Sequence, residues 1–396
     1  MANTEKKFLK TPSAPLKLAY TAGSKDMAQA VSDIIVRERH AYAAKYPELA
    51  SLPDYNQDSF MLDMKLSRYG TGEGYVRLNE TVRGTDLFIF CDITNYTPTF
   101  KVCGRDNHYS PDNHFQDLKR IISATNGRAN RIKVVMPFLY EGRQHKRTGR
   151  ESLDCSMALK ELADYGVNEI ITFDAHDPRV MNAIPLVSFD NYMPTYQFLK
   201  ALIENVPDIQ LDKEHFMVVS PDEGAMNRGL YFSNLIGVDM GTFYKRRDYS
   251  KVVNGRNPVV AHEFLGDNVE GMDVIVIDDM ISSGGSMLDV CKQLKERGCR
   301  KVFMCATFGL FTNGFDEFDK YYENGWIDKL ICTNLTYLPD ELLSKPYFAA
   351  ANMYNYLAST VNAINHDLPS NIKSTASMIT SLITERETIA NLIHKN

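Results

Sequence analysis

The chain is poor in tryptophan, in paired cysteines and in long apolar runs. One tryptophan occurs among 396 residues, and none of the seven cysteines forms a Cys-x-x-Cys pair. Most of them stand among apolar residues, so we expect reduced core residues and not disulfides or zinc ligands. They are Cys91, Cys103, Cys155, Cys291, Cys299, Cys305 and Cys332.

No apolar run approaches the roughly 20 residues that cross a bilayer. The opening residues Met1–Lys7 lack the apolar stretch of a signal peptide. We therefore expect a cytoplasmic protein with no membrane partner.

The chain also lacks an excess of positive charge. Its 44 Lys and Arg are outnumbered by 50 Asp and Glu, which gives a net charge of −6. A nucleic-acid-binding surface usually needs the opposite balance, so no nucleic-acid partner is expected. A length of 396 residues exceeds the roughly 150 of a usual domain, which favours two domains.

One structural unit recurs along the chain: a short apolar strand, a polar turn and an amphipathic helix. The clearest case starts at the β-branched strand Val274–Ile277, continues through a helix after Gly285, and ends in the strand Val302–Ala306. This pattern predicts an α/β fold with two parallel sheets that divide near residues 185 to 195. Further strands are expected at Leu16–Tyr20, Asp86–Phe90, Lys133–Met136, Glu169–Phe173 and Phe216–Val219.

Two stretches, 37–62 and 95–113, are polar and show no periodicity. We expect both to be surface excursions. The tail 374–396 carries a stripe of apolar residues, which predicts a helix packed against the rest of the protein.

Acidic residues follow three of the expected strands. They are Asp174 with His176, then Asp222, then the adjacent pair Asp278 and Asp279. In open parallel sheets ligands bind at the carboxyl ends of the strands, so these residues are candidates for a binding site. Adjacent carboxylates repel each other unless a cation or sugar hydroxyls share the site, and imidazole with carboxylates suits a divalent metal.

A loop rich in serine and glycine follows the acidic pair and leads into a helix. Hydroxyls and backbone N–H groups at a helix N-terminus bind phosphate. Together with the preceding acids, the loop predicts a sugar-phosphate site. Its residues are Ser282, Ser283, Gly284, Gly285 and Ser286.

Two basic segments are further candidates. Lys245–Arg247 follows a strand-like stretch, and the hairpin signal Asn254–Gly255 comes shortly after it. These cations are expected on an exposed flap that can close over a polyphosphate. Arg143 and Gln144 open a basic loop, for which a nucleotide clamp and an ordinary charged surface are both open readings.

Taken in order, these motifs resemble the ribose-phosphate pyrophosphokinase family, also called phosphoribosyl pyrophosphate synthetases, over most of residues 16–365. The resemblance rests on Glu80–Asp86, Pro137–Gln144, Asp174–His176, Ser220–Gly224, Lys245–Arg247 and Val276–Ser286. It implies two type I phosphoribosyltransferase-like domains, each a mainly parallel sheet flanked by helices, with a flap hairpin.

The resemblance also implies how the chain divides. Residues 15–187 with about 346–370 would form the N-terminal domain on the ATP side. Residues 188–345 would form the C-terminal domain on the ribose 5-phosphate side, and 371–396 a C-terminal helical extension.

In function, the resemblance implies Mg2+-dependent transfer of the pyrophosphoryl group of ATP to the anomeric hydroxyl of ribose 5-phosphate, which gives phosphoribosyl pyrophosphate and AMP. Lys245 and Arg247 would be catalytic and stabilise the transferring phosphates. The Mg2+ residues would be His176, Asp222 and Asp174.

For the substrates, the implied ATP residues are Arg143 and Gln144, with Tyr69 and Glu73 supplied by a neighbouring subunit of a homo-oligomer. The implied ribose 5-phosphate residues are Asp278, Asp279, Ser282, Ser283, Gly284, Gly285 and Ser286.

The sequence departs from the family pattern within these motifs. Ser282 stands where a third Asp is usual, Ser283 and Ser286 stand where Thr is usual, and His145 follows Gln144 where Asp is usual. Two alternatives therefore stay open. One is a phosphoribosyltransferase that consumes phosphoribosyl pyrophosphate, and the other is a catalytically silent homologue that regulates an active synthetase.

Overall fold

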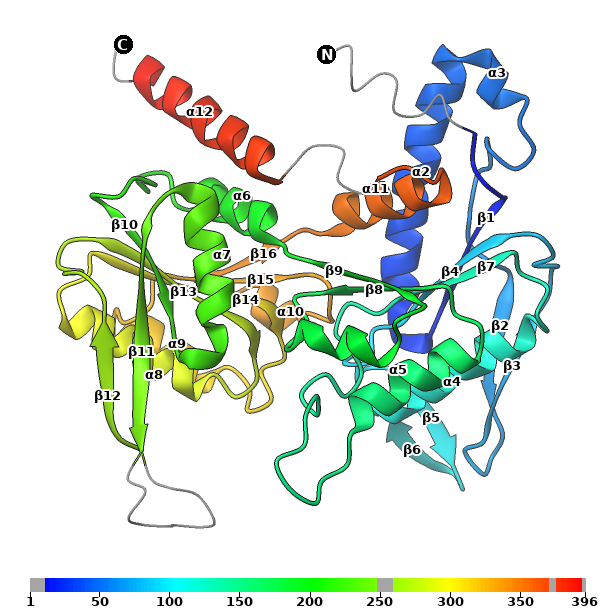
Figure 1. Ribbon diagram of the computed structural model, residues 1–396, viewed down its shortest axis with the longest axis horizontal. Coiled ribbons are helices and arrows are strands. Elements are labelled where there is room, and N and C mark those ends of the chain that lie inside the picture. Colours follow the sequence, from blue (N-terminus) through cyan, green and yellow to red (C-terminus); the bar gives the residue numbers. More distant parts are fainter. Residues whose placement is uncertain (1–10, 248–258, 370–374, 394–396) are drawn as a thin grey trace. The chain divides into compact units, whose positions relative to one another are not determined.

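The computed structural model describes residues 11–247, 259–369 and 375–393, with the backbone alone at 245–247, 259–262 and 385–393. The described chain forms two compact units (Figure 1). Residues 11–193, 335–337 and 353–369 make up the first unit, and 194–334, 338–352 and 375–393 make up the second. The predicted α/β class, with two sheets, is confirmed.

The first unit is built on a five-stranded sheet in the order β1-β4-β7-β8-β9, in which every neighbouring pair is parallel. Four of these strands lie where the sequence predicts them. The fifth, β9, has the partly polar sequence Ser-Phe-Asp-Asn-Tyr of an edge strand and gives no apolar signal. The domain boundary expected after residue 187 thus precedes the last strand of this sheet. The bounds are β1 Leu16–Tyr20, β4 Asp86–Phe90, β7 Arg131–Val135, β8 Glu169–Phe173 and β9 Ser188–Tyr192.

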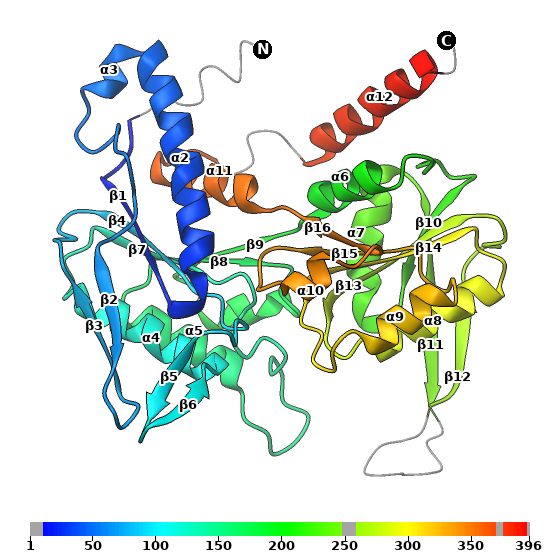
Figure 2. The same ribbon diagram turned by 180° about the vertical axis from the view of Figure 1, so that it is seen from behind.

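Helices cover both faces of this sheet, as Figures 1 and 2 show from opposite sides. α4 and α5 share a buried core with strand residues such as Ile89, Val134 and Ile170. α2 and α11 lie together on the other face. The bounds are α2 Lys25–Lys45, α4 Pro111–Ala124, α5 Asp154–Asp164 and α11 Tyr354–Asn365, with the short α3 at Pro47–Ala50 and 3-10 turns at Ala22–Ser24 and Pro178–Ala183.

Neither stretch predicted as a surface excursion is one throughout. In 37–62, α2 continues to Lys45, and Arg39 and Tyr55 are both buried. In 95–113, a hairpin of β5 (Thr99–Val102) and β6 (Arg105–His108) precedes α4, whose start is fixed by a capping box between Ser110 and Asn113. A second hairpin joins β2 (Met64–Arg68) to β3 (Gly74–Leu78). The buried face of α2 escaped prediction because it includes Ser32 and Arg39 among its apolar residues.

Arg39 joins α2 to α11 inside the first unit. Its Nη2 donates to Oδ1 of Asn362 at 2.9 Å and to Oδ1 of Asn365 at 2.7 Å. Asn365 in turn donates from Nδ2 to Oδ2 of the buried Asp86 at 2.9 Å. Burial lowers the pKa of Arg39 to about 10, and it remains a cation at neutral pH.

We expect Arg39→Ala to lower the free energy of unfolding by about 3 kcal/mol, because it removes buried charge-assisted hydrogen bonds and leaves two amide oxygens without their donor. Urea titration followed by circular dichroism measures this. Arg37→Ala is the matched control, since Arg37 is exposed on the same helix and should change stability by less than about 0.5 kcal/mol. Equal losses in the two variants would contradict the assigned role.

The second unit is built on a seven-stranded sheet in the order β12-β11-β10-β13-β14-β15-β16. β12 is antiparallel to β11, and all other neighbours are parallel. The bounds are β10 Phe216–Ser220, β11 Asp239–Arg247, β12 Val259–Leu265, β13 Asp273–Ile281, β14 Lys301–Gly309, β15 Lys329–Thr333 and β16 Phe348–Ala351.

Strand β13 is buried on both faces, as its β-branched run predicts. Val274 and Val276 belong to the core shared with α8 and α9, whereas Ile275 and Ile277 belong to the core shared with α6 and α7. α12 packs on the second of these cores through the buried Ile379, so the predicted docking of the tail helix is confirmed. The bounds are α6 Thr195–Asn205, α7 Met226–Ile236, α8 Gly285–Glu296, α9 Asp316–Glu323, α10 Asp340–Leu343, α12 Thr375–Ile393 and a 3-10 turn at Glu223–Ala225.

The seven cysteines are all free thiols. Six are buried, and burial raises the pKa of Cys155 and of Cys299 to about 12, which keeps both protonated. Cys103 is an exception to the predicted core placement, because it lies exposed in the turn between β5 and β6 at φ +50°. Among the described helices, none combines the length and apolar character needed to span a membrane.

Candidate active site

The carboxyl edge of the second sheet carries three acidic residues on two neighbouring strands. Asp222 follows β10 and accepts a hydrogen bond from the Gly224 N–H at 3.0 Å. Asp278 and Asp279 lie within β13, which continues to Ile281, four residues past the predicted end. The edge thus brings these three predicted residues to one side of one unit.

Arg228 of α7 lies between the two adjacent acids. Its Nη1 is 3.3 Å from Oδ1 of Asp278, and its Nη2 is 3.8 Å from Oδ2 of Asp279. The sequence analysis missed this residue. The signal was the pair of adjacent acids, because neighbouring carboxylates at a strand end need a cation, and α7, which follows the adjacent strand β10, offers an arginine.

One guanidinium does not neutralise the edge. Burial raises the pKa of Asp278 well above its usual value, and the charges of Asp279 and, more weakly, Asp222 raise it further, while Arg228 opposes the shift. The edge is therefore suited to a ligand that donates hydroxyl protons or brings a divalent cation.

The loop after β13 leads directly into α8, and most of its residues are exposed. Ser283, Gly285 and Ser286 are exposed, and Gly284 takes the N-cap position at φ +84° without a side-chain cap. A Cβ at Gly284 would lie 2.2 Å from Cζ of Phe318, so conformation and space both require glycine there. The first N–H groups of a helix have no partner within the helix and carry its positive dipole end, which is the arrangement that binds phosphate.

The carboxyl edge of the first sheet carries the other predicted metal residues. Asp174 follows β8, is buried, and has φ +41°, with its N–H donating to the Tyr192 carbonyl at 2.9 Å. His176 is exposed two residues further on. Asp174 and His176 thus belong to the first unit, and Asp222 to the second.

A second acid on this edge was not singled out from the sequence. Asp92 follows β4, and burial raises its pKa to about 6. Hydrogen bonds from Thr94 and from the Tyr337 N–H act in the opposite direction and lower the pKa. The sequence could have indicated Asp92, because this acid directly follows the apolar strand β4 and Cys91.

Arg143 and Gln144 lie in the loop between β7 and α5. Arg143 is exposed, whereas Gln144 donates from Nε2 to the Ser152 carbonyl at 2.8 Å and so ties the two ends of the loop together. The loop starts from Glu141, which has φ +53°.

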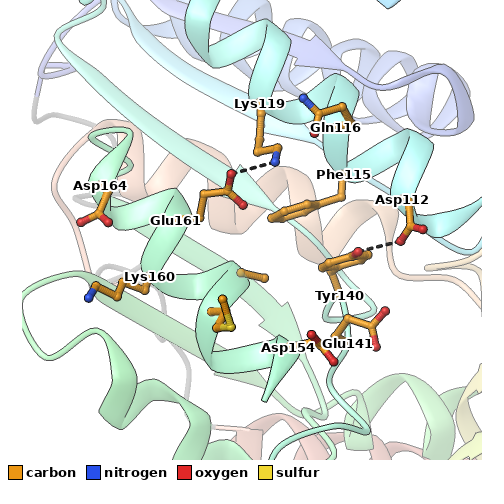
Figure 3. A pocket seen from close by; sticks show the side chains of 12 residues that line it. Asp112, Phe115, Gln116, Lys119, Tyr140, Glu141, Asp154, Lys160, Glu161 and Asp164 are labelled. Carbon is orange, nitrogen blue, oxygen red and sulfur yellow. Dashed lines mark hydrogen bonds and ion pairs between the residues drawn. The ribbon is translucent and has the colours of Figure 1, made fainter. Parts of the chain in front are cut away.

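The base of this loop is held by packing between α4 and α5 (Figure 3). Tyr140 stacks on Phe115 with centroids 4.2 Å apart and donates from its hydroxyl to Asp112 at 2.7 Å. A groove of about 610 Å3 lies over this pair, and Lys119 and Glu161 form an ion pair at 2.7 Å in its wall. None of the predicted site residues lines the groove. The contacts of Tyr140 with Phe115 and Asp112 position the start of the Arg143 loop.

Tyr69 and Glu73 lie in the turn of the β2–β3 hairpin. The Tyr69 N–H donates to the Glu73 carbonyl at 2.8 Å, and the Tyr69 ring, 58% exposed, leans on Tyr75 at 5.5 Å. An aromatic ring presented this way is available to a ligand or to another subunit.

The backbone of Lys245 and Arg247 lies in β11, opposite His262 and Val259 of the antiparallel β12. Their side chains, and the Asn254–Gly255 turn, lie outside the described residues. The predicted catalytic arm therefore stays a prediction. In the described part of the chain, no three His, Cys, Asp or Glu residues gather in an arrangement that would hold a metal unaided.

Two α/β units of largely parallel strands, with acids at the strand ends and a Ser/Gly loop opening a helix, define a protein of the phosphoribosyltransferase-like class. Residues 16–166 match the profile of the N-terminal domain of ribose phosphate pyrophosphokinase, and residues 189–323 match that of the phosphoribosyl transferase domain. The chain belongs to the ribose-phosphate pyrophosphokinase family, a family of enzymes.

Individual relatives agree with this assignment. The chain is 29% identical to the ribose-phosphate pyrophosphokinase of Vibrio parahaemolyticus over 309 residues, which is 77% of this chain and 88% of the relative. It is 27% identical to that of Pasteurella multocida over 324 residues, or 81% and 94% of the two chains. The phosphoribosylpyrophosphate synthetase structure from Mycobacterium smegmatis superposes with a TM-score of 0.66 at 22% identity, covering 89% of this chain and 99% of the other, and supports the fold.

Proposed function

We propose that the protein transfers the pyrophosphoryl group of ATP to the anomeric hydroxyl of ribose 5-phosphate, yielding phosphoribosyl pyrophosphate and AMP. The anomeric oxygen attacks the β-phosphorus, the bond from that phosphorus to the oxygen shared with the α-phosphate breaks, and the hydroxyl proton is released. The reaction is one of nucleotide biosynthesis, and we place it in the cytoplasm. The observation that carries the proposal is the acidic edge joined to the Ser/Gly loop in the second unit.

That edge fits a pentose phosphate residue by residue. Asp278 and Asp279 would accept hydrogen bonds from the ribose hydroxyls, which would compensate for the burial and for the Asp279 charge that together raise the pKa of Asp278. The loop Ser282–Ser286 would hold the 5-phosphate at the start of α8. Ser282 keeps a hydroxyl for this task in place of the third acid usual in the family.

The donor set of both sheet edges also fits Mg2+, which prefers oxygen ligands and keeps several waters or substrate oxygens. At the second edge, the burial of Asp278 together with the neighbouring acids Asp279 and Asp222 favours a cation. Asp174 and His176 would hold such an ion or its waters at the edge of the first unit, and Asp222 would do so at the edge of the second. When bound, Mg2+ would neutralise charge on the phosphate oxygens during transfer.

The remaining predicted residues would position ATP. Arg143, exposed on its loop, would contact the phosphates, and Gln144 would hold that loop in place. Tyr69 and Glu73 of a neighbouring subunit would complete the adenine site, which implies a homo-oligomer. Lys245 and Arg247 would stabilise the charge that develops on the transferring group.

Incubation of the purified protein with Mg2+, ATP and ribose 5-phosphate tests the proposal. We expect AMP and phosphoribosyl pyrophosphate to form in equal amounts, as measured by anion-exchange chromatography and 31P NMR. No AMP should form when ribose 5-phosphate is left out. Product formed solely from a nucleobase and preformed phosphoribosyl pyrophosphate would identify a phosphoribosyltransferase. Nucleotide binding without any turnover would identify a silent homologue, and either result would overturn the proposal.

A further inference from the structure

Two histidines and an aspartate lie together at the carboxyl edge of the first sheet. His145 comes from the loop after β7, and His176 and Asp177 come from the turn after the neighbouring β8. The two imidazole rings have centroids 5.4 Å apart and planes inclined by 59°. Nε2 of His145 is 3.6 Å from Oδ2 of Asp177.

The carboxylate of Asp177 is itself fixed. Arg179 donates to it from Nε at 2.9 Å and from Nη2 at 2.6 Å. These two hydrogen bonds hold the carboxylate in one orientation beside His145. A carboxylate beside one imidazole nitrogen favours the tautomer with its proton on that nitrogen, and this leaves the lone pair on the other.

That other nitrogen has nothing to bind within the described part of the chain. Nδ1 of His145 is buried and makes no hydrogen bond there, and the side chain is 12% exposed. A buried acceptor left unsatisfied costs about 1–3 kcal/mol, so its retention calls for a ligand. At metal sites a ligating imidazole usually has a carboxylate beside its second nitrogen. Asp177 is an ion-pair neighbour of that nitrogen at 3.6 Å, beyond hydrogen-bond distance.

We propose that His145 and His176 together bind a divalent transition-metal ion, with Asp177 positioning His145. The ring separation is compatible with this, because metal–nitrogen bonds of about 2.1 Å place both centroids about 3.2 Å from a shared ion, at an angle near 115°. The described part of the chain offers no third side-chain ligand in place. The remaining ligands are therefore waters and the phosphate oxygens of a bound nucleotide, and in this respect the inference rests on the proposed function.

The chemistry of position 145 sets the metal preference. Mg2+ favours carboxylate, carbonyl and water oxygens, whereas imidazole nitrogen suits Co2+ and Zn2+. The family usually has Asp where this chain has His145, so the side chain at this position offers nitrogen where an aspartate would offer oxygen. This site therefore binds Co2+ or Zn2+ more tightly than Mg2+, and it still accepts the Mg2+ of the proposed reaction through His176.

Cobalt titration is the direct test, because Co2+ reports nitrogen ligands in its visible absorption. The full chain is titrated with Co2+ in the presence of α,β-methylene-ATP, an ATP analogue whose α–β bridge cannot be cleaved. We expect one Co2+ per chain and at least about tenfold weaker binding in His145→Asn and in Asp177→Asn. Circular dichroism verifies that each variant is folded.

Two further variants keep the test decisive. His145→Asp supplies an oxygen ligand and should bind Mg2+ at least as well as the parent while losing the Co2+ absorption. His215→Asn is the matched control, because His215 also pairs with an aspartate, Asp212 at 2.6 Å, on an exposed surface of the second unit, and it should leave Co2+ binding unchanged.

Unaltered Co2+ binding in both His145 variants, or an equal loss in His215→Asn, would overturn the inference. The proposed function is judged separately. If Co2+ binding depends on His145 but no AMP is formed, the proposed function is wrong and the metal site is supported. If AMP is formed but Co2+ binding does not depend on His145, the metal site is wrong and the proposed function is supported.

Discussion

Lys245→Ala is expected to lower the rate of AMP formation from ATP and ribose 5-phosphate about 100- to 1000-fold, the effect of removing one preorganised positive or hydrogen-bonding group from a developing phosphate charge. The free energy of unfolding should change by less than about 0.5 kcal/mol, as expected for the exposed flap that the sequence predicts. The backbone pairing of Lys245 with His262 does not depend on the side chain. Steady-state kinetics and thermal melts on the same preparations measure both quantities.

Lys101→Ala is the control for this experiment. Lys101 is exposed in the β5–β6 hairpin, where it pairs with Asp106 at 3.0 Å, and its loss should affect neither rate nor melting. A Lys245→Ala variant with normal turnover would remove the catalytic arm from the proposed mechanism. A melting temperature lowered in step with the rate would instead indicate a structural residue.

Asp278→Asn is expected to separate stability from activity. Without ligand, the variant should be more stable than the parent at about pH 8, by about 1–3 kcal/mol, because it removes a carboxylate whose folded-state pKa is raised by burial and by Asp279. Its amide oxygen can still accept the Asp279 N–H, which donates to Asp278 at 2.8 Å. Turnover should nevertheless fall about 100-fold, because a charged acceptor for the sugar hydroxyls is lost.

The pH dependence follows from the direction of the shift. Between the usual aspartate pKa of about 4 and the raised value, the folded protein binds more protons at this group than the unfolded chain does. The free energy of unfolding therefore falls as pH rises through that window, and it should fall less steeply in Asp278→Asn. Urea titrations at several pH values, with EDTA present to remove metal, measure the two slopes.

Asp208→Asn is the matched control in the same unit. Lys301 and Arg300 lower the pKa of Asp208, so its folded form favours the charge and the variant should lose stability above about pH 4. Opposite signs for the two variants are the expected result. A less stable Asp278→Asn at about pH 8 would mean that Asp278 is not under the electrostatic strain described.

Much of the fold was accessible from the sequence because its central strands are buried on both faces. Such strands need unbroken β-branched or apolar runs, as in Val274–Ile277, and these are visible without a structure. β9 was missed because an edge strand can be partly polar. The extension of α2 was missed because Arg39 is buried through amide partners more than 300 residues away in sequence, and no local pattern reports such a pairing.

The site could be predicted where its acidic and hydroxyl residues directly follow the apolar run of a strand. Asp222, Asp278 and the Ser/Gly loop stand at those positions, and the structure places all three at one edge of the second unit. Arg228 was not predictable in the same way, because it acts from a helix interior and is defined by the acids it contacts. His145 was visible as a departure from the family pattern, but its meaning depends on Asp177 and His176, which only folding brings near.

The order in which the first unit receives its parts constrains how the protein is made. α11, which supplies Asn362 and Asn365 to Arg39, leaves the ribosome after the entire second sheet has been synthesised. Until α11 is synthesised, the guanidinium of Arg39 on α2 lacks these acceptors. The first unit therefore stays incomplete while the sheet of the second unit is being synthesised. Early termination anywhere before residue 365 therefore damages the first unit, although most of its sequence has already been translated.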